Sequence, residues 1–389
     1  MPWKEVKPMH EKLLFIADNV RKVSNFSQLC ITYGISRKTG YKWLERFKDD
    51  GFEALSERTR KPHGHPDETP YAVQQAICKL RDQRDVPGPK KIRAMLLKQL
   101  AENEIPSVTT IYKVLKRAGM IEAKRRTRNR VVTRTGPLKS AHTPNELWSA
   151  DYKGQFMTLD GKWCYPLTVM DHASRYLLQC QGLPGTRYQE TRAAFERLFH
   201  EYGLPDRIRT DNGVPFVTMG TANLSRLSIW WMRLGIYHER IEPGQPQQNG
   251  RHERMHRTLK RSLGQPLAAT LDKQQIELDA FQNYYNDERP HEGLDQRSPS
   301  AIYKPSSRAY PRRLPEIEYP TYFDHARVRS SGLIYWRSFT IYVGNLLTGE
   351  NVGIEATGDG LWDIYFGHVR LGMLDERKTK EKNYLSIKG

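Results

Sequence analysis

The chain has 389 residues, and 62 Lys and Arg against 44 Asp and Glu give a formal net charge of +18. This length predicts two to four domains, and a hydrophobic content of 38% excludes a globally disordered chain. No apolar run approaches the ~18 residues of a membrane helix, the N-terminus resembles no signal peptide, and four scattered cysteines suit a reducing cytosol. We therefore expect a cytoplasmic protein with a polyanionic partner, nucleic acid before a membrane surface.

Residues 1–60 carry two short helical patterns separated by Gly34, with Ser36 as the expected N-cap of the second helix. The outward face of that second helix is basic, and its candidate DNA contacts are Arg37, Lys38, Tyr41 and Lys42. This layout is typical of a helix-turn-helix, whose second helix enters the major groove. The alternative is an ordinary helical hairpin with a solvated basic face.

A second helical unit is predicted over 71–122, with helices at 71–84, 88–102 and 107–118. The last helix directs Lys113, Lys116 and Arg117 outward as candidate DNA contacts. The Pro-, Gly- and His-rich stretch 61–70 indicates a linker, and its two histidines lack the further ligands of a metal site. Two such units in tandem favour DNA binding.

Residues 123–143 form a second predicted linker, which contains seven Lys and Arg and no acid between 124 and 140. Such a run is usually a solvated segment, but it can also follow DNA phosphates, and the two interpretations are compatible. The candidate contacts are Lys124, Arg125, Arg126 and Arg128.

Beyond the linker the pattern changes to alternating strands and helices. Three successive strands between 145 and 181, followed by alternating helices and strands to about 262, predict a mixed sheet with helices on both faces. We assign 144–300 to this central α/β domain. Short β-patterned runs over 301–375 predict a small antiparallel barrel, with a sandwich as the alternative, and 376–389 form a charged tail.

Three carboxylates stand out by their context. Asp151 lies on the first predicted strand, Asp211 ends the strand RIRTD before Asn212-Gly213, and Glu253 lies near the start of a helix. Two or three carboxylates can hold a pair of Mg²⁺ ions for phosphodiester chemistry. Each also has an ordinary interpretation, as a turn-ordering Asp or as part of a helical ion pair.

The run HERMH over 252–256 matches H-E-x-x-H, the helix signature of zinc proteases. A zinc protease needs a third ligand, and Glu277 is the only obvious downstream candidate. That hypothesis explains neither the tandem helical units nor the positive charge, so we expect these histidines to flank a carboxylate.

Four motifs in order resemble the retroviral-integrase superfamily, and most closely the insertion-sequence transposases of bacteria: LWSADYKG, RTDNGVPF, QPQQNGRHERMHRTLKR and YYNDERPHEGLDQRSPSAIY. The resemblance covers most of the chain. It implies a ribonuclease-H-like core in which Asp151, Asp211 and Glu253 form the Asp-Asp-Glu triad. Two departures are a long gap of 41 residues between Asp211 and Glu253 and the absence of the zinc-binding His/Cys module of retroviral integrases.

The resemblance implies a transposase in which the triad binds two Mg²⁺ ions, for which Mn²⁺ can substitute. Its DNA partners would be the terminal inverted repeats of the element and a target DNA, and Arg257 and Lys260 would contact the DNA backbone. The protein would act as a homo-oligomer in the bacterial nucleoid, without a membrane partner. The alternatives are a non-catalytic DNA-binding regulator on the same fold and a nuclease that cuts without joining.

Overall fold

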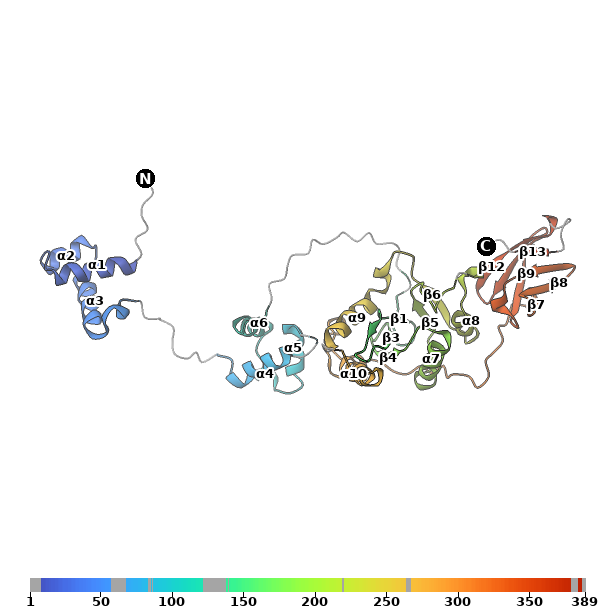
Figure 1. The fold of residues 1–389 in the computed structure, drawn as a ribbon, viewed down its shortest axis with the longest axis horizontal. Helices are drawn as coiled ribbons and strands as arrows, with labels where there is room; N and C mark the ends of the chain where they lie inside the picture. The colour runs from blue at the N-terminus through green and yellow to red at the C-terminus, as the bar shows by residue number, and fades with distance from the viewer. Residues whose placement is uncertain are drawn as a thin grey trace. The chain divides into compact units, whose positions relative to one another are not determined.

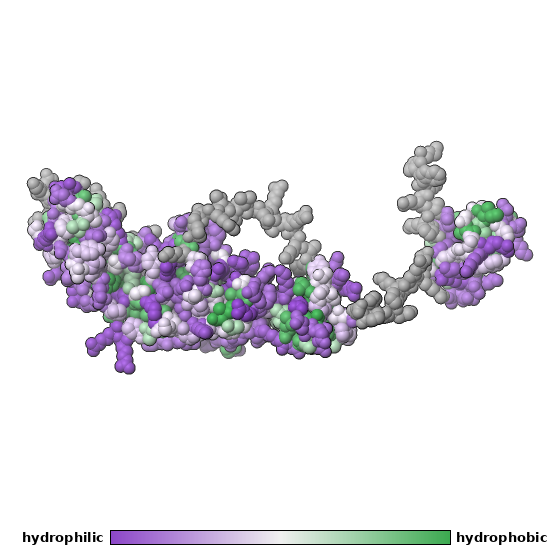
Figure 2. Space-filling view, turned by 180° about the vertical axis from the view of Figure 1, so that it is seen from behind, coloured by the Kyte–Doolittle hydropathy of each residue, from purple (hydrophilic) through white to green (hydrophobic). Residues whose placement is uncertain are grey.

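The computed structural model describes residues 8–56, 68–82, 85, 87–121, 138, 140–218, 220–263, 267–378 and 384–386. The chain divides into two compact units, Met1–Glu68 and Thr69–Gly389. Within the described residues, no helix is both long and apolar enough to cross a bilayer. Figure 2 shows a mostly hydrophilic face on which apolar residues form scattered patches, as the high charge content predicts.

The first unit is a small helical domain built from α1 (Pro8–Val20), α2 (Phe26–Thr32), α3 (Arg37–Asp50) and the 3-10 helix η1 (Gly51–Leu55). Ser36 caps α3 as predicted, because its hydroxyl accepts a hydrogen bond from the Thr39 N–H at 3.1 Å. Gly40 lets α3 approach its neighbours closely: a Cβ there would lie 2.9 Å from both Cys30 Sγ and a Phe26 ring carbon. The observed helix, turn and helix match the prediction.

The second unit begins with α4 (Tyr71–Arg81), α5 (Pro89–Leu96), the 3-10 helix η2 (Glu102–Glu104) and α6 (Val108–Arg117). The predicted helix 88–102 is too long, since α5 ends at Leu96 and turns follow it. Ile111, Val114 and Leu115 of α6 are buried in a local core.

The central sheet is mixed, as predicted. Its strands are β1 (Trp148–Tyr152), β2 (Phe156–Met157), β3 (Trp163–Asp171), β4 (Leu177–Leu183), β5 (Arg207–Thr210) and β6 (Tyr237–Arg240). β3 pairs antiparallel with β1, β2 and β4, whereas β1, β5 and β6 run parallel. The antiparallel strands β2, β3 and β4 therefore form one side of the sheet, and the parallel strands β5 and β6, which alternate with helices, form the other side.

Helices cover both faces of this sheet (Figure 1). One face packs against α7 (Tyr188–Tyr202) and α8 (Arg226–Arg233), and the other against α9 (Gly250–Ser262) and α10 (Leu271–Asn283), which continues as the π-turn η5 (Tyr284–Glu288). Alternation along β1 sends Trp148 and Ala150 into the first layer, so that Ser149 and Asp151 face the second.

The C-terminal part corrects one prediction. Its strands are β7 (Asp324–Arg327), β8 (Leu333–Trp336), β9 (Phe339–Tyr342), β10 (Asn351–Gly358), β11 (Leu361–Phe366), β12 (Val369–Asp375) and β13 (Tyr384–Ser386). Within the described residues they form two sheets, ordered β12-β11-β10-β7 and β13-β9-β8, and not a closed barrel. β7 pairs with β10 while β8 pairs with β9, so no ladder joins the sheets, and β13 runs parallel to β9.

Both sheets share one hydrophobic core, which also takes up Ile229 and Met232 of α8. The remaining short helical turns are η3 (Thr221–Asn223), η4 (Pro246–Asn249), η6 (Glu292–Leu294), η7 (Pro299–Ala301), η8 (Asn345–Leu347) and η9 (Glu376–Lys378).

Candidate active site

Asp151 lies on the central strand β1, on the face that α9 covers. Its side chain is 22% exposed. Burial, followed by the negative charges of Asp211 and then Glu253, raises the pKa of Asp151 to about 7. The carboxylates that the sequence singled out are therefore close enough to repel one another.

Asp211 follows directly on the end of β5, the parallel neighbour of β1. In the ladder, Ile208 lies beside Trp148 and Arg209 beside Ser149. Two residues further along each strand, the same register places Asp211 level with Asp151. The Gly213 N–H donates to Asp211 Oδ1 at 3.1 Å and so fixes the start of the following turn.

Glu253 is an exposed residue in the first turn of α9. The preceding residue, His252, is fully buried and docks this turn onto the sheet. Its Nδ1 lies 2.8 Å from Ser149 Oγ on β1, and its Nε2 lies 2.7 Å from Thr168 Oγ1 on β3. Burial lowers the pKa of His252 well below its ordinary value, so the ring is neutral.

Thr168 also fixes the tautomers of both histidines of the HERMH run. Its hydroxyl donates to the Asp151 carbonyl oxygen at 3.0 Å, so its lone pairs face His252 Nε2 and His256 Nε2, each at 2.7 Å. Both Nε2 atoms then donate. His256 Nδ1 keeps its lone pair and lies 3.8 Å from Asp151 Oδ2.

The zinc-protease hypothesis gains no support from this geometry. In the described part of the chain, one group of ligating side chains has its donor atoms within 4.8 Å of one another, namely Asp151, His252 and His256. Glu277, the proposed third ligand, is outside that group, and both nitrogens of His252 are already engaged by hydroxyls.

The three carboxylates fit a hard divalent cation better than zinc. Oxygen donors are what Mg²⁺ prefers, and here they crowd a partly buried site in which Asp151 carries an unfavourable charge. Among the described residues, the oxygens of the three carboxylates do not all lie within 4.8 Å of one another.

Two other acids of the central domain, Asp171 and Asp160, have structural partners. Asp171 is buried, and its carboxylate accepts hydrogen bonds from the N–H groups of Asn145 at 2.8 Å and Ser174 at 2.7 Å. Asp160 accepts from the Thr158 hydroxyl at 2.6 Å and pairs with Lys162 in a turn.

The predicted DNA contacts are placed at the surface wherever the structure describes them. The exposed ones are Arg37, Lys38, Tyr41, Lys42, Lys113, Lys116, Arg117, Arg257 and Lys260. Lys124, Arg125, Arg126 and Arg128 lie outside the described residues.

Sequence reasoning missed several basic residues that gather beside α9. Arg175, Arg251, Arg254 and Arg289 line one cavity with Arg257 and Lys91. Their positions are far apart in the sequence, so only the fold brings them together. Several of these arginines lie in or beside the motifs that resemble the integrase superfamily, but the motifs do not indicate that the side chains share a cavity.

Family models match four stretches of the chain. A homeodomain-like domain model matches residues 39–115, two integrase core domain models match 141–246 and 234–299, and a model of the C-terminal domain of IS481 family transposases matches 325–382.

Curated relatives include proteins of two bacterial insertion elements. The chain is 25% identical to the uncharacterized 31.7 kDa protein of IS407 from Burkholderia multivorans, over 60% of this chain and 82% of that protein. It is 28% identical to the uncharacterized 39.2 kDa protein of IS476 from Xanthomonas euvesicatoria, over 52% of this chain and 58% of that protein. The chain is also 30% identical to a Gag-Pol polyprotein of avian reticuloendotheliosis virus, over 31% of this chain and 10% of that polyprotein.

Among solved structures, the chain matches the HTLV-2 integrase catalytic core domain in complex with magnesium, with a TM-score of 0.33 and 17% identity over 42% of this chain and 98% of that one. It also matches the simian T-cell lymphotropic virus intasome, with a TM-score of 0.38 and 14% identity over 77% of this chain and 96% of that one. The family assignment rests on the sequence models.

The mixed sheet and the core-domain matches define a protein with an integrase catalytic core, that is, an enzyme of the class that includes DDE transposases. The homeodomain-like match before this core and the IS481 C-terminal-domain match after it point to one group of enzymes within this class. The chain is an insertion-element transposase that combines a helix-turn-helix DNA-binding domain, the integrase core and a C-terminal part that matches the C-terminal domain of IS481 family transposases.

Proposed function

We propose that Asp151, Asp211 and Glu253 are the catalytic residues of this transposase and hold two Mg²⁺ ions, for which Mn²⁺ can substitute. When bound, the ions would activate an attacking oxygen and stabilise a leaving oxygen. The observation that carries this proposal is the parallel register of β1 and β5, which sets Asp211 level with Asp151 on the face that α9 covers with Glu253 in its first turn. The charges of both other carboxylates contribute to the raised pKa of Asp151. A cation removes that repulsion, so the site favours a bound metal ion.

The proposed reaction consists of two phosphoryl transfers. Water attacks a phosphodiester at the element end, the bond from phosphorus to the 3′ oxygen breaks, and a 3′-hydroxyl is released. That hydroxyl then attacks a phosphodiester of the target, and a new P–O bond forms as the target strand breaks. No protein–DNA covalent intermediate is needed.

The chain's own residues orient these steps. The buried His252 ties the first turn of α9 to β1 and β3, and it thereby fixes the backbone that carries Glu253. Arg257 and Lys260 lie one and two turns after Glu253 on the same helix, where they would contact the DNA backbone. The exposed basic residues of α3 and α6 would contact the terminal inverted repeats.

For the domain organisation we keep the sequence-based division: helix-turn-helix domains at 1–60 and 71–122, linkers at 61–70 and 123–143, a ribonuclease-H-like core at 144–300, a β domain at 301–375 and a tail at 376–389. The protein would act in the bacterial nucleoid, as a homo-oligomer that synapses two element ends.

One assay tests the proposed function. Wild-type protein is incubated with Mg²⁺ and a labelled duplex that carries the element end, and nicked and joined products are separated. We expect both products. Binding without cleavage would instead identify a DNA-binding regulator, and cleavage without joining would identify a nuclease.

A further inference from the structure

A cavity of about 250 Å³ lies beside α9, on the side that faces α5 and the turn after α10. Six cationic side chains line it, from four separate parts of the second unit: Lys91, Arg175, Arg251, Arg254, Arg257 and Arg289. Glu292 is the one acid among the lining residues, and its carboxylate is engaged by Lys90 at 3.0 Å. The cavity therefore carries a large excess of positive charge.

Half of these cations have no direct partner among the described side chains, although the more distant charges of Asp85 and Glu292 act on Lys91. Within the described residues, Lys91, Arg175 and Arg257 have neither a hydrogen bond nor an ion pair. The Arg254 Nε–H donates only to the Gly250 carbonyl of its own helix, at 3.0 Å. Arg289 is the exception, because it pairs with the buried Asp85 at 2.7 Å.

The Arg175 guanidinium occupies its place because residue 293 is glycine. A Cβ on Gly293 would lie 1.9 Å from Arg175 Nη2. The guanidinium is thus packed against the backbone of η6, without a partner for its charge.

The titration behaviour of the cluster agrees with this geometry. Burial and then the charge of Arg289 lower the pKa of Lys91 to about 8. Burial likewise lowers the pKa of Arg175, with Arg254 and Arg289 adding to the effect. Cations held this close destabilise one another until an anion joins them.

We propose that this cavity binds a backbone phosphodiester of the DNA, gripped between Arg175 and the arginines of α9. Guanidinium groups suit this role, since they hold phosphate oxygens with paired N–H donors. The inference rests on the proposed function, because it places the phosphate on the same DNA that reaches Glu253.

The position of the cavity favours DNA over a free anion. Arg254 directly follows Glu253 and Arg257 lies one turn beyond it, and both are exposed. A strand that leaves the catalytic carboxylates along α9 would therefore meet these side chains next. Lys91 extends the contact to α5, so that the second helical domain and the core would hold the same duplex.

The test measures DNA binding by the full chain without divalent metal, so that strand cleavage plays no part. The affinity for a fluorescent duplex is followed from about 50 to 200 mM salt. We expect Arg175→Gln and Arg254→Gln each to weaken binding severalfold and to lower the slope of log K against log salt by about one. Arg254→Lys should keep most of the slope.

Two further variants test whether DNA binding depends on the position of the Arg175 guanidinium and on charges inside the cavity, or only on the total positive charge of the protein. Gly293→Ala keeps every charge but displaces the Arg175 guanidinium, so we expect weaker binding from it as well. Arg312→Gln removes an equally positive but exposed side chain outside the cavity and should leave the slope unchanged. Thermal unfolding without DNA should show Arg254→Gln at least as stable as wild type, because repulsion is relieved.

Wild-type affinity and slope in Arg175→Gln and Arg254→Gln would overturn the inference. So would stabilisation of wild type, but not of these variants, by inorganic phosphate with unchanged DNA binding, since the ligand would then be a free anion. If the variants show reduced salt slopes but the wild-type protein does not cleave DNA, the phosphate site in the cavity is supported and the proposed function is refuted. Wild-type slopes in a protein that cleaves and joins would refute the cavity alone.

Discussion

At the scale of single residues, Asp151 is a carboxylate held in an unfavourable place. The fold buries it and sets two more acids near it, so its pKa rises to about 7 in the metal-free protein. An unfolded chain would protonate the same group near ~3.9. Between these values the folded state binds the extra proton, and stability therefore falls as pH rises.

We predict that Asp151→Asn stabilises the metal-free protein at pH ~8 by about 1–3 kcal/mol, while it abolishes cleavage and joining. The gain should vanish near pH ~2–3, below both pKa values, where wild-type Asp151 is protonated in both states. Urea unfolding at the two pH values measures this difference. Equal stability at the higher pH would show that the carboxylate is not strained.

His252 carries a second residue-scale prediction. His252→Leu would remove the hydrogen bonds that the hydroxyls of Ser149 and Thr168 make to the His252 ring, and we expect a loss of about 2–4 kcal/mol in stability together with reduced cleavage. The control His325→Leu changes an exposed histidine of β7 and should leave unfolding unchanged. Wild-type stability in His252→Leu would show that these hydrogen bonds do not dock α9.

The residues that sequence reasoning could locate were those with local motifs. Asp151, Asp211 and Glu253 each lie in a recognisable run, and strand alternation places Asp151 opposite the apolar layer. The anchoring role of His252 was hidden, because its partners are distant in sequence: Ser149 on β1 and Thr168 on β3.

At the scale of elements, α3 has one face that packs against its neighbouring helices and an exposed basic face that we expect to bind DNA. Gly40 lies under Cys30 and Phe26, where a Cβ would come within 2.9 Å of both side chains. We predict that Gly40→Ala destabilises the first unit by about 1–3 kcal/mol, although alanine is the better helix former. Thermal unfolding of the full chain, followed by circular dichroism, measures the loss.

Lys38→Ala on the same helix provides the matched comparison. Its side chain is exposed, so unfolding should stay at the wild-type value while affinity for DNA falls. A stable Gly40→Ala variant would mean that the close approach of α2 and α3 is not required.

Elements with strong periodicity were predictable, and their pairing was less so. The three successive strands predicted between 145 and 181, and the alternating helices and strands predicted after them, appear in the structure. The C-terminal strands were also located, but the barrel was wrong. Their lengths and turns indicate hairpins, whereas the pairing of β7 with β10 and of β8 with β9 depends on contacts that no local pattern encodes.

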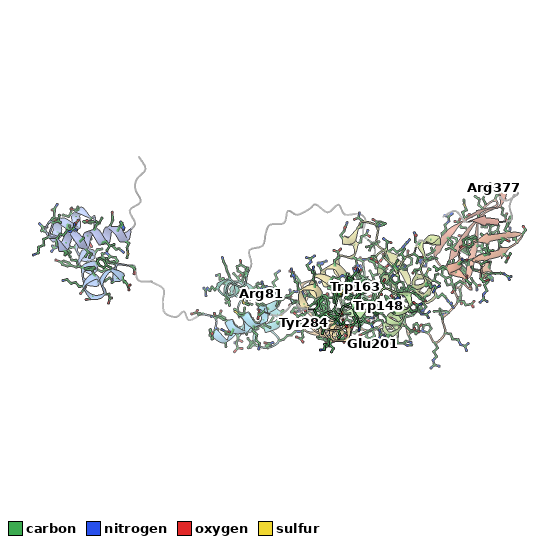
Figure 3. All side chains as sticks on the ribbon, in the orientation of Figure 1. Arg81, Trp148, Trp163, Glu201, Tyr284 and Arg377 are labelled. Carbon is green, nitrogen blue, oxygen red and sulfur yellow. The ribbon has the colours of Figure 1, made fainter. Side chains whose placement is uncertain are left out.

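At the scale of the whole molecule, a buried ion pair connects the second helical domain to the core. Asp85 Oδ2 lies 2.7 Å from Arg289 Nε, and the Asp85 side chain is fully buried. The Tyr284 hydroxyl donates to Asp85 Oδ1 at 2.8 Å (Tyr284 is labelled in Figure 3). No local sequence pattern indicates this contact, because about 200 residues separate the partners.

We predict that Asp85→Asn costs about 3–5 kcal/mol, because it leaves Arg289 partly buried without its counter-charge. The exposed pair Lys90–Glu292 crosses the same junction, and Lys90→Gln should have no measurable effect on unfolding. Chemical denaturation of the two variants compares them directly. Equal stability would mean that the second helical domain is not held to the core by Asp85.

The central claim is that three carboxylates carry the metal-dependent chemistry of this transposase. The most direct measurement is Mg²⁺-dependent cleavage and joining of a labelled element-end duplex by Asp151→Asn, Asp211→Asn and Glu253→Gln, with Asp160→Asn as control. We expect all three triad variants to bind the duplex but form neither product, while Asp160→Asn matches wild type. Cleavage by any triad variant at the wild-type rate would contradict its assignment to the metal site.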